Sequence, residues 1–370
     1  GVPVIQASQW SELLGKPATA VEVVWTGTEF GLLWLASEAS SGLRPLMFGR
    51  ASASGEFLGD PVLLGQAATS SHRIVFTGVR YIVAWVNGGV GDDPYDGIRV
   101  GVVSTEGAVA ELVSDIDGTY NTSQLDLAWD ELSGGLLTFT RGSLGESGLF
   151  SVVINEDGTL NGENVIDARN VSAFASTFGD GAWAVTYAVR DEELSDPVLL
   201  HLLDDEGVVY DPEPIEIGNR ALGRLHIAYG QGNYAIAWTG LNQEDKLLPV
   251  TVLLDGAAEI IGQPIISLNA DFGVVEDLVI TESTGFVFSW HGELELVPVL
   301  GVQVMSILGI LENSVMMALD PDNAYSQSRI VLGATRGGEI NLLSTSDPDP
   351  QPLGYSADVN IQRTQVQACE

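Results

Sequence analysis

Cysteine is almost absent from this chain. Cys369, one residue from the end, is the only thiol among 370 residues and has no partner for an internal disulfide. Sparse cysteine is typical either of a reducing compartment or of a secreted bacterial protein that is stable without crosslinks. A nucleophilic role is not expected at such a terminal position, so we expect Cys369 to be inert.

Positive charge is also scarce. The chain has 15 Lys and Arg against 50 Asp and Glu, a formal net charge of −35, and only Lys16 and Lys246 are lysines. A field of this sign repels phosphate backbones and anionic lipid headgroups, so nucleic acid and membrane surfaces are not expected partners. No apolar stretch approaches the roughly 20 residues of a membrane helix, and helical periodicity is nowhere sustained.

Sequence motifs of familiar reactions are missing as well. No G-x-S-x-G, P-loop or dinucleotide-binding motif stands between a strand and a helix. The four histidines, His72, His201, His226 and His291, are not spaced as zinc or iron ligands. His72 and His226 stand at the start of expected inner strands, where they could approach a central channel. These absences favour a protein that is not an enzyme without deciding the question.

The chain does contain a repeat of about 51 residues. A large aromatic recurs at steps of 51, 54, 48, 51 and 52 residues, at Trp34, Trp85, Phe139, Tyr187, Trp238 and Trp290. Another aromatic precedes five of them by four residues, at Phe30, Tyr81, Trp183, Tyr234 and Phe286. Such a repeat is one supersecondary unit copied around or along an axis. Because a position repeated in every unit usually packs one unit against the next, we assign this aromatic column to the core.

Each repeat predicts four antiparallel strands. The first two, for example 73–76 and 81–85, are apolar runs joined by a turn that usually contains glycine, which is the pattern of a β-hairpin. The third, such as 98–103, follows a longer polar loop, and a fourth closes the unit. The turns after the third strands are marked by Gly55, Gly107, Gly158, Gly207, Gly256 and Gly309.

This organisation resembles the seven-bladed β-propeller superfamily over the whole chain. The resemblance is to the fold only, because the WD40, kelch and sialidase Asp-box motifs are missing. It implies one all-β domain, 1–370, with blades of four antiparallel strands at 20–66, 67–116, 117–168, 169–218, 219–269, 270–319 and 320–362. We expect residues 1–8 to close the last blade as its outer strand, and its third strand to lie near 353–360. A ring of six or eight blades and an open solenoid are the alternatives.

The loops that lead into the first strands, among them 65–72, are the expected place of function. Arg73, Arg169, Arg220, Arg224 and Arg329 all fall in or beside these loops. Because an arginine fork recognises carboxylates, we predict an anion or acidic-sugar site at the mouth of the central channel. Its candidate residues are Arg73, Arg224, Arg329, Tyr120, Tyr325, Asp126 and Asp277. The alternative is that each arginine pairs with a neighbouring carboxylate, such as Asp126, Asp167 or Asp277.

The loops between second and third strands are acidic and could hold calcium, the one cofactor that the sequence suggests. Ca²⁺ is bound by several oxygen atoms, which clustered carboxylates supply. The leading candidates are Asp92, Asp93 and Asp96, which precede Gly97. No stretch has the complete D-x-[DN]-x-[DN]-G spacing, so a solvated acidic surface is the alternative.

Three functions are consistent with this sequence. The leading hypothesis is a non-catalytic binding or surface-display propeller, a monomer that recognises a glycan or a protein. We expect it to be extracellular, at the cell surface or in the periplasm, and Gly1, which falls inside an expected strand, suggests a trimmed chain. The rival is a glycoside hydrolase or polysaccharide lyase that uses Asp126, Asp277 and a channel arginine. A structural link in a larger assembly is the third, and the fold does not choose between them.

Overall fold

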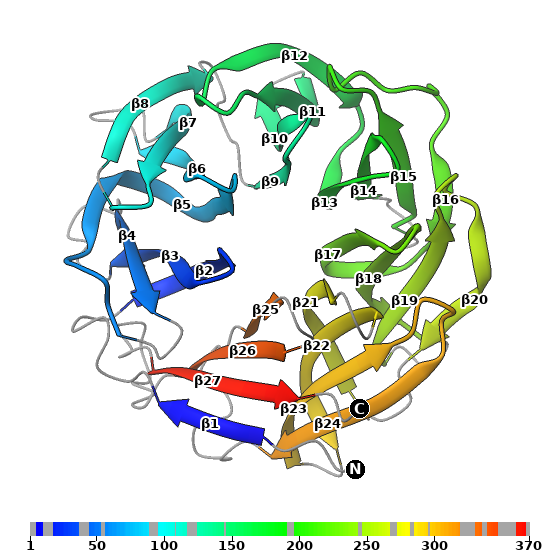
Figure 1. Ribbon diagram of the computed structural model, residues 1–370. Coiled ribbons are helices and arrows are strands. Elements are labelled where there is room, and N and C mark those ends of the chain that lie inside the picture. The colour runs from blue at the N-terminus through cyan, green and yellow to red at the C-terminus, as the bar shows by residue number, and fades with distance from the viewer. Residues whose placement is uncertain are drawn as a thin grey trace.

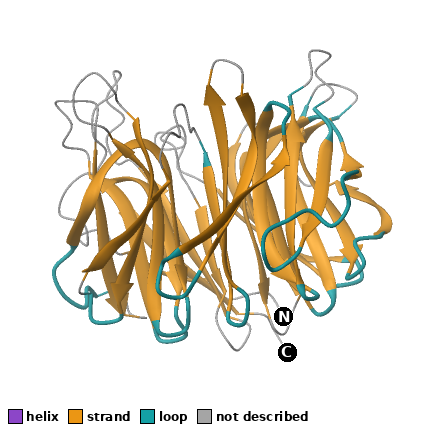
Figure 2. Ribbon diagram, turned by 90° about the horizontal axis from the view of Figure 1, so that it is seen from above, coloured by secondary structure: helices purple, strands orange, loops and turns teal. Residues whose placement is uncertain are grey.

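Antiparallel strands and the turns between them make up the part of the chain that the computed structural model describes. That part comprises residues 5–9, 18–36, 44–52, 56–88, 95–107, 109–116, 124–143, 146–190, 196–242, 246–266, 272–281, 285–294, 297–318, 330–334, 339–346 and 360–367. Figure 1 shows these strands as blades around a central axis, which confirms the expected β-propeller. These ranges contain no helix (Figure 2), and hence none long and apolar enough to cross a membrane.

The first two blades share one long strand. The sheet comprises β2 (Ala18–Trp25), β3 (Glu29–Ala36), β4 (Arg44–Ser52), β5 (Val62–Phe76), β6 (Arg80–Gly88), β7 (Tyr95–Ser104) and β8 (Val109–Ile116). The first part of β5 pairs with β4 and the last part with β6, with a register shift between Ala67 and His72. The expectation of a loop at 65–72 is therefore wrong. The small and hydroxyl-bearing residues of this segment continue the strand, because the backbone passes directly from pairing with β4 to pairing with β6.

The next four blades are separate four-stranded sheets. Their strands are β9 (Leu125–Asp130), β10 (Gly134–Ser143), β11 (Glu146–Ile154) and β12 (Leu160–Asp167); β13 (Val171–Gly179), β14 (Ala182–Val189), β15 (Val198–Leu203) and β16 (Ile215–Gly218); β17 (Ala221–Gly230), β18 (Asn233–Leu241), β19 (Leu247–Asp255) and β20 (Ile260–Ile266); and β21 (Phe272–Thr281), β22 (Gly285–Leu294), β23 (Val297–Met305) and β24 (Leu311–Ala318). Within each of these blades, strands adjacent in sequence are antiparallel neighbours, and Figure 1 shows the first strand of each blade nearest the axis.

The last blade joins the two ends of the chain. β25 (Ile330–Ala334), β26 (Glu339–Ser346) and β27 (Asn360–Gln367) are followed in the sheet by β1 (Ile5–Gln9), which pairs with β27. The predicted closure by the N-terminal strand is confirmed. The third strand begins later than the predicted 353–360. Because β27 has the mostly polar sequence NIQRTQVQ, hydrophobic patterning gives little indication of its position.

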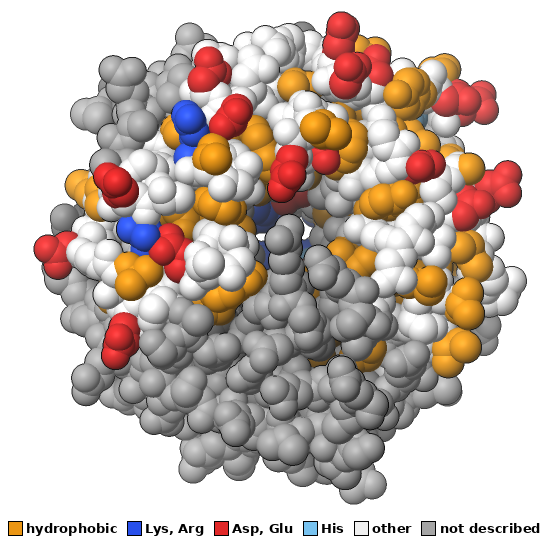
Figure 3. All heavy atoms as spheres, in the orientation of Figure 1, with side chains coloured by type: hydrophobic (Ala, Val, Ile, Leu, Met, Phe, Trp, Pro, Cys, Tyr) orange, Lys and Arg blue, Asp and Glu red, His pale blue; other side chains and the backbone are white. Residues whose placement is uncertain are grey.

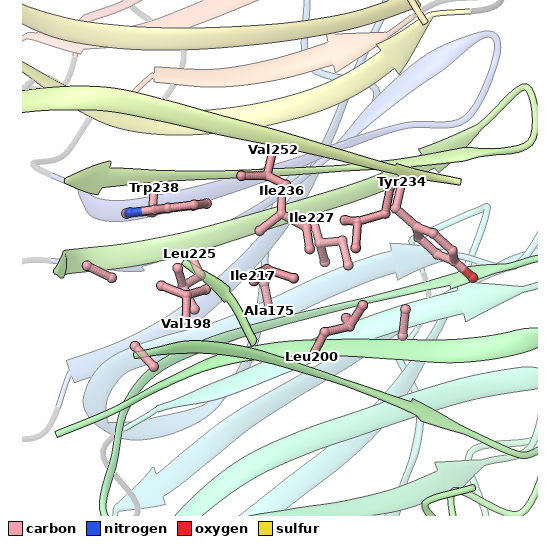
Figure 4. Close-up of a cluster of buried hydrophobic side chains, with 14 of the residues drawn as sticks. Ala175, Val198, Leu200, Ile217, Leu225, Ile227, Tyr234, Ile236, Trp238 and Val252 are labelled. Atoms are coloured by element: carbon pink, nitrogen blue, oxygen red, sulfur yellow. The ribbon is translucent and has the colours of Figure 1, made fainter. Parts of the chain in front are cut away.

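The recurrent aromatics are buried, as predicted. All six are 4% exposed or less. Glycine lets their rings approach the neighbouring strand, because a Cβ atom on Gly218 would lie only 2.7 Å from the Trp238 ring. Figure 4 shows the result between the fourth and fifth blades. There Trp238, Ile236 and Leu225 belong to the same hydrophobic cluster as Val198, Leu200 and Ile217 of the preceding blade.

The aromatic that stands four residues before the column also connects neighbouring blades, at Tyr81 and Tyr234. The Tyr81 hydroxyl donates a hydrogen bond of 2.7 Å to Glu29 in the preceding blade, and Arg50 donates from Nε and Nη2 to the same carboxylate at 2.7 Å each. Burial raises the pKa of Glu29, but the hydrogen bonds from Arg50 and Tyr81 outweigh it, so that this pKa lies below its ordinary value. In the fifth blade, the Tyr234 hydroxyl donates to the backbone oxygen of Gly179 at 2.6 Å.

One of the predicted turn glycines is misplaced. The turn position after the third strand has a left-handed backbone, and its amide donates to the carbonyl three residues earlier, as Gly207 does to Asp204 with φ at 77°. In the fifth blade this position belongs to Ala258, at φ 63°, and not to Gly256. Alanine tolerates this conformation at a cost of roughly 1–2 kcal/mol, so glycine spacing alone could not locate the turn. Gly55 lies outside the described residues.

Candidate binding site in the central funnel

A ring of polar side chains surrounds the axis of the propeller. Each of the first strands β2, β5, β9, β13, β17 and β21 contributes one member. These residues, which we call the polar ring, are Glu22, Arg73, Asp126, Ser176, His226 and Asp277. Their steps along the chain are 51, 53, 50, 50 and 51 residues. The ring is therefore a second column of the same repeat, one strand closer to the axis than the aromatic column (Figure 1).

Strand register brings the ring residues to a common level. In five blades the ring residue pairs with the residue before the recurrent aromatic, as His226 does with Ala237. In the fourth blade Ala175 has this pairing, and Ser176 is the next residue. In the last blade the corresponding position is Val331, which pairs with Leu343. The ring residues thus keep a nearly constant register relative to the aromatic column.

Direct contacts link four consecutive blades through this ring. Arg73 donates from Nη1 to Oε1 of Glu22 and from Nε to Oδ1 of Asp126, both at 2.9 Å. The other oxygen of Asp126 accepts from the amide and the hydroxyl of Ser176, both at 2.8 Å. Burial lowers the pKa of Arg73, but the charges of Glu22, Asp126 and Asp277 outweigh burial and raise it above its ordinary value. Arg73 is therefore a permanent cation held between carboxylates.

Two histidine–carboxylate pairs follow in the fifth and sixth blades. Nδ1 of His226 lies 3.7 Å from Oδ1 of Asp277, and Nδ1 of His291 lies 2.6 Å from Oε1 of Glu276. A register shift between Val275 and Asp277 puts Glu276 in an irregular position, and both acidic residues line the same cavity. Nε2 of His226 is buried and has no hydrogen-bond partner among the described residues.

The polar ring lines a cavity of about 580 Å³, which we call the central funnel. The early residues of β9, β13 and β17 form much of its wall, so it opens on the face where the first strands begin. Ser71, Gln124 and Ser172 add uncharged polar groups, and Arg190 and Asp196 come from the connection between β14 and β15. Figure 3, a view along the axis, shows the propeller hollowed at its centre.

Acidic side chains outnumber basic ones in this funnel. The lining carboxylates are Glu22, Asp126, Asp196, Glu276 and Asp277, and the lining arginines are Arg73, Arg190 and Arg224. Arg73, moreover, already contacts two of the carboxylates. The local field therefore favours a neutral or cationic ligand over an anionic one.

The structure brings four of the predicted site residues together. Arg73, Arg224, Asp126 and Asp277 all line the central funnel. Arg329, Tyr120 and Tyr325 lie outside the described residues. Ion pairing, the alternative function considered for the arginines, occurs at Arg73 and also at Arg169, whose Nη2 lies 2.5 Å from Oδ2 of Asp167.

The structure describes little of the predicted calcium site. Asp92 and Asp93 lie outside the described residues, and Asp96 falls within β7. Across the described ranges, no three His, Cys, Asp or Glu side chains are placed together as metal ligands would be. Calcium binding stays a prediction.

Sequence reasoning missed Glu22, Ser176 and Glu276 as funnel residues. A signal for the first two exists, because every ring residue precedes the aromatic of its blade by 11 to 13 positions. Comparing the repeats at that offset would have identified the ring. Glu276 carries no such signal, because it reaches the funnel through an irregularity in strand pairing.

Comparison with known proteins supports the fold alone. No protein-family model matches the chain, and no curated protein sequence matches it significantly. The polysaccharide lyase Uly1 is similar at a TM-score of 0.56 and 10% identity, over 94% of this chain and 89% of the lyase. The β-propeller domain of the Trilobed protease from Pyrococcus furiosus is similar at 0.54 and 10% identity, over 89% and 92%. The Aleuria aurantia lectin is similar at 0.50 and 11% identity, over 83% and 97%. By fold, then, this chain is a β-propeller.

Proposed function

We propose that this protein is a non-catalytic, extracellular binding propeller that holds a neutral or basic, hydroxyl-rich oligosaccharide in the central funnel. The polar ring carries this proposal. Cavities for apolar ligands are lined mostly by apolar side chains, whereas this funnel offers carboxylates, hydroxyls, an amide and guanidinium groups. Sugar hydroxyls both donate and accept hydrogen bonds, and such a mixed wall satisfies both roles.

The state of Arg73 argues against an acidic sugar as the preferred ligand. Its guanidinium already contacts Glu22 and Asp126, and five carboxylates line the funnel. A uronate entering there would have to overcome that negative field or displace one of the two contacts. Arg224 is exposed on β17 and lines the funnel, so it is the better candidate for hydrogen bonding to a ligand.

The similar folds of a polysaccharide lyase and of a lectin bound to a fucosylated sugar are compatible with this proposal. At about 10% identity they support only that a β-propeller can present a carbohydrate site. The choice of funnel and of ligand class depends on the residues of this chain.

Isothermal titration calorimetry with neutral, amino-sugar and uronate oligosaccharides tests the proposal. We expect neutral or amino-sugar oligomers to bind and Arg224→Ala to weaken them about tenfold or more, since a hydrogen bond to a charged group contributes roughly 1.5–3 kcal/mol. Arg80→Ala is the matched control, because Arg80 is exposed, pairs with Glu156 at 3.9 Å and lies outside the funnel. A preference for uronates, or equal losses in the two variants, would contradict the proposal.

A polysaccharide-cleaving enzyme is the rival function. Glycosidases need two carboxyl groups at a defined separation of about 5–5.5 or 6.5–9.5 Å, and both oxygens of Asp126 are already occupied by Arg73 and Ser176. Release of reducing ends or unsaturated products from polysaccharides, abolished by Asp277→Asn, would establish the rival.

A further inference from the structure

Leu132 is the most exposed large apolar side chain in the described part of the chain, at 96%. It stands at the turn between β9 and β10, on the face opposite the mouth of the funnel. The turn is well held, because Oδ2 of Asp130 accepts hydrogen bonds from the amides of Leu132 and Ser133 at 2.9 and 2.8 Å. The exposed leucine is thus presented in a defined conformation.

Two hollows flank this leucine, and it lines both. The hollow towards the second blade has a volume of about 530 Å³ and includes Val79 and Trp129. The hollow towards the fourth blade has a volume of about 570 Å³ and includes Phe178 and Tyr210. Val79 is 57% and Tyr210 61% exposed. Val79, Leu132 and Tyr210, which we call the apolar row, come from the turns of three consecutive blades.

Negative charge surrounds the apolar row. Asp130 and Asp205 line one hollow, and Glu131 and Glu156 line the other. Arg80, beside Val79, already faces Glu156 at 3.9 Å.

Charge complementarity selects the partner that fits this surface. An acidic rim repels nucleic acid and anionic lipid headgroups. It also repels a second copy of a chain with a net charge of −35. A partner that fits this surface has apolar side chains, which enter the two hollows, and flanking cations, which pair with the surrounding carboxylates.

We propose that the apolar row is the docking surface for a polypeptide segment of a partner protein that carries both Lys or Arg and large apolar residues. Leu132 is its central contact, since it separates the two hollows and its turn is already ordered before binding, which lowers the entropic cost of association. This site is separate from the central funnel, so a ligand and a partner could be held at once on opposite faces.

A labelled synthetic peptide of alternating Leu and Lys clusters is the probe, with binding measured by fluorescence anisotropy at several salt concentrations. We expect Leu132→Ser to weaken binding about tenfold or more and added salt to weaken it further. The matched control is Leu308→Ser, because Leu308 is 73% exposed on a turn of the sixth blade. This control substitution should change binding less than about twofold. Replacing Lys with Glu in the peptide should abolish binding.

Three results would overturn the proposal: no binding of the Lys-containing peptide, equal losses for Leu132→Ser and Leu308→Ser, or equal binding of the Glu-containing peptide. Sedimentation of the wild-type protein alone tests the choice of partner. A dimer abolished by Leu132→Ser would show that a second copy covers the row instead. Both leucines are exposed, so unchanged thermal unfolding should accompany both substitutions.

Discussion

The aromatic column and the polar ring follow the same repeat but differ in what varies along them. The aromatic column holds Trp, Phe or Tyr in each of six blades, and every member is buried. The polar ring, one strand inward, holds an acid, a base, a hydroxyl or an imidazole, depending on the blade. A position that packs blades together needs similar chemistry in each, whereas a position facing a shared cavity can differ in each. In a repeat protein, a regularly spaced position with varying polar chemistry therefore indicates a site.

Among the substitutions that test this contrast, Trp238→Ala has the largest expected effect on stability. Its side chain is 2% exposed and belongs to the cluster between the fourth and fifth blades. We expect a loss of about 3–5 kcal/mol in the free energy of unfolding, from lost burial and the cavity left behind. Urea denaturation measures this loss, and an unchanged midpoint would contradict the assignment of the aromatic column to the core.

Asp126→Asn tests the polar ring, with an expected effect on stability smaller than that of Trp238→Ala. The substitution keeps the shape but removes the charge that Arg73 and Ser176 contact, so we expect a loss of about 1–3 kcal/mol. Glu163→Gln is the matched control, because Glu163 pairs with Arg141 at 2.6 Å while its side chain is 35% exposed, and such surface pairs contribute about 1 kcal/mol or less. If urea midpoints fell equally in both variants, the ring would contribute no more than an ordinary surface pair.

Glu29→Gln tests an ionic contact between blades that does not line the funnel, and it has the smallest expected effect. Because the folded-state pKa of Glu29 is lowered, its contacts contribute stability above its ordinary pKa of 4.5 and lose it as the pH falls through the lower folded-state value. We therefore expect the variant to lose less stability than the wild type between about pH 5 and pH 2. Parallel pH profiles of the unfolding midpoint would contradict this.

The overall fold was accessible from the sequence because its main determinant is periodic. The aromatic spacing, the hairpin turns and the strand expected at 1–8 predicted the blades and their closure. What failed was local. The continuous β5 had no loop at 65–72, β27 was too polar to be placed by hydrophobicity, and Ala258 took a turn position that glycine usually marks. At each of these places the structure depends on backbone pairing or backbone conformation, which the pattern of side chains does not indicate.

The funnel could be predicted only in part. Arg73, Arg224, Asp126 and Asp277 were singled out by type and position, and the structure places them around one cavity. That Arg73 lies between Glu22 and Asp126 depends on contacts between residues 51 and 53 positions apart. Such contacts require the curvature of the ring, which periodicity does not specify. The sequence left open whether these arginines bind an anion or pair with neighbouring carboxylates, and Arg73 pairs with two of them.

The uninterrupted β5 has a consequence for how the molecule comes apart. Its 15 residues pair with β4 at one end and β6 at the other, so the first two blades share one continuous strand. The four blades that follow are separate sheets and share no strand among the described residues. The first two blades should therefore open as one cooperative unit in native-state hydrogen exchange, with a single free energy of opening for amides of both.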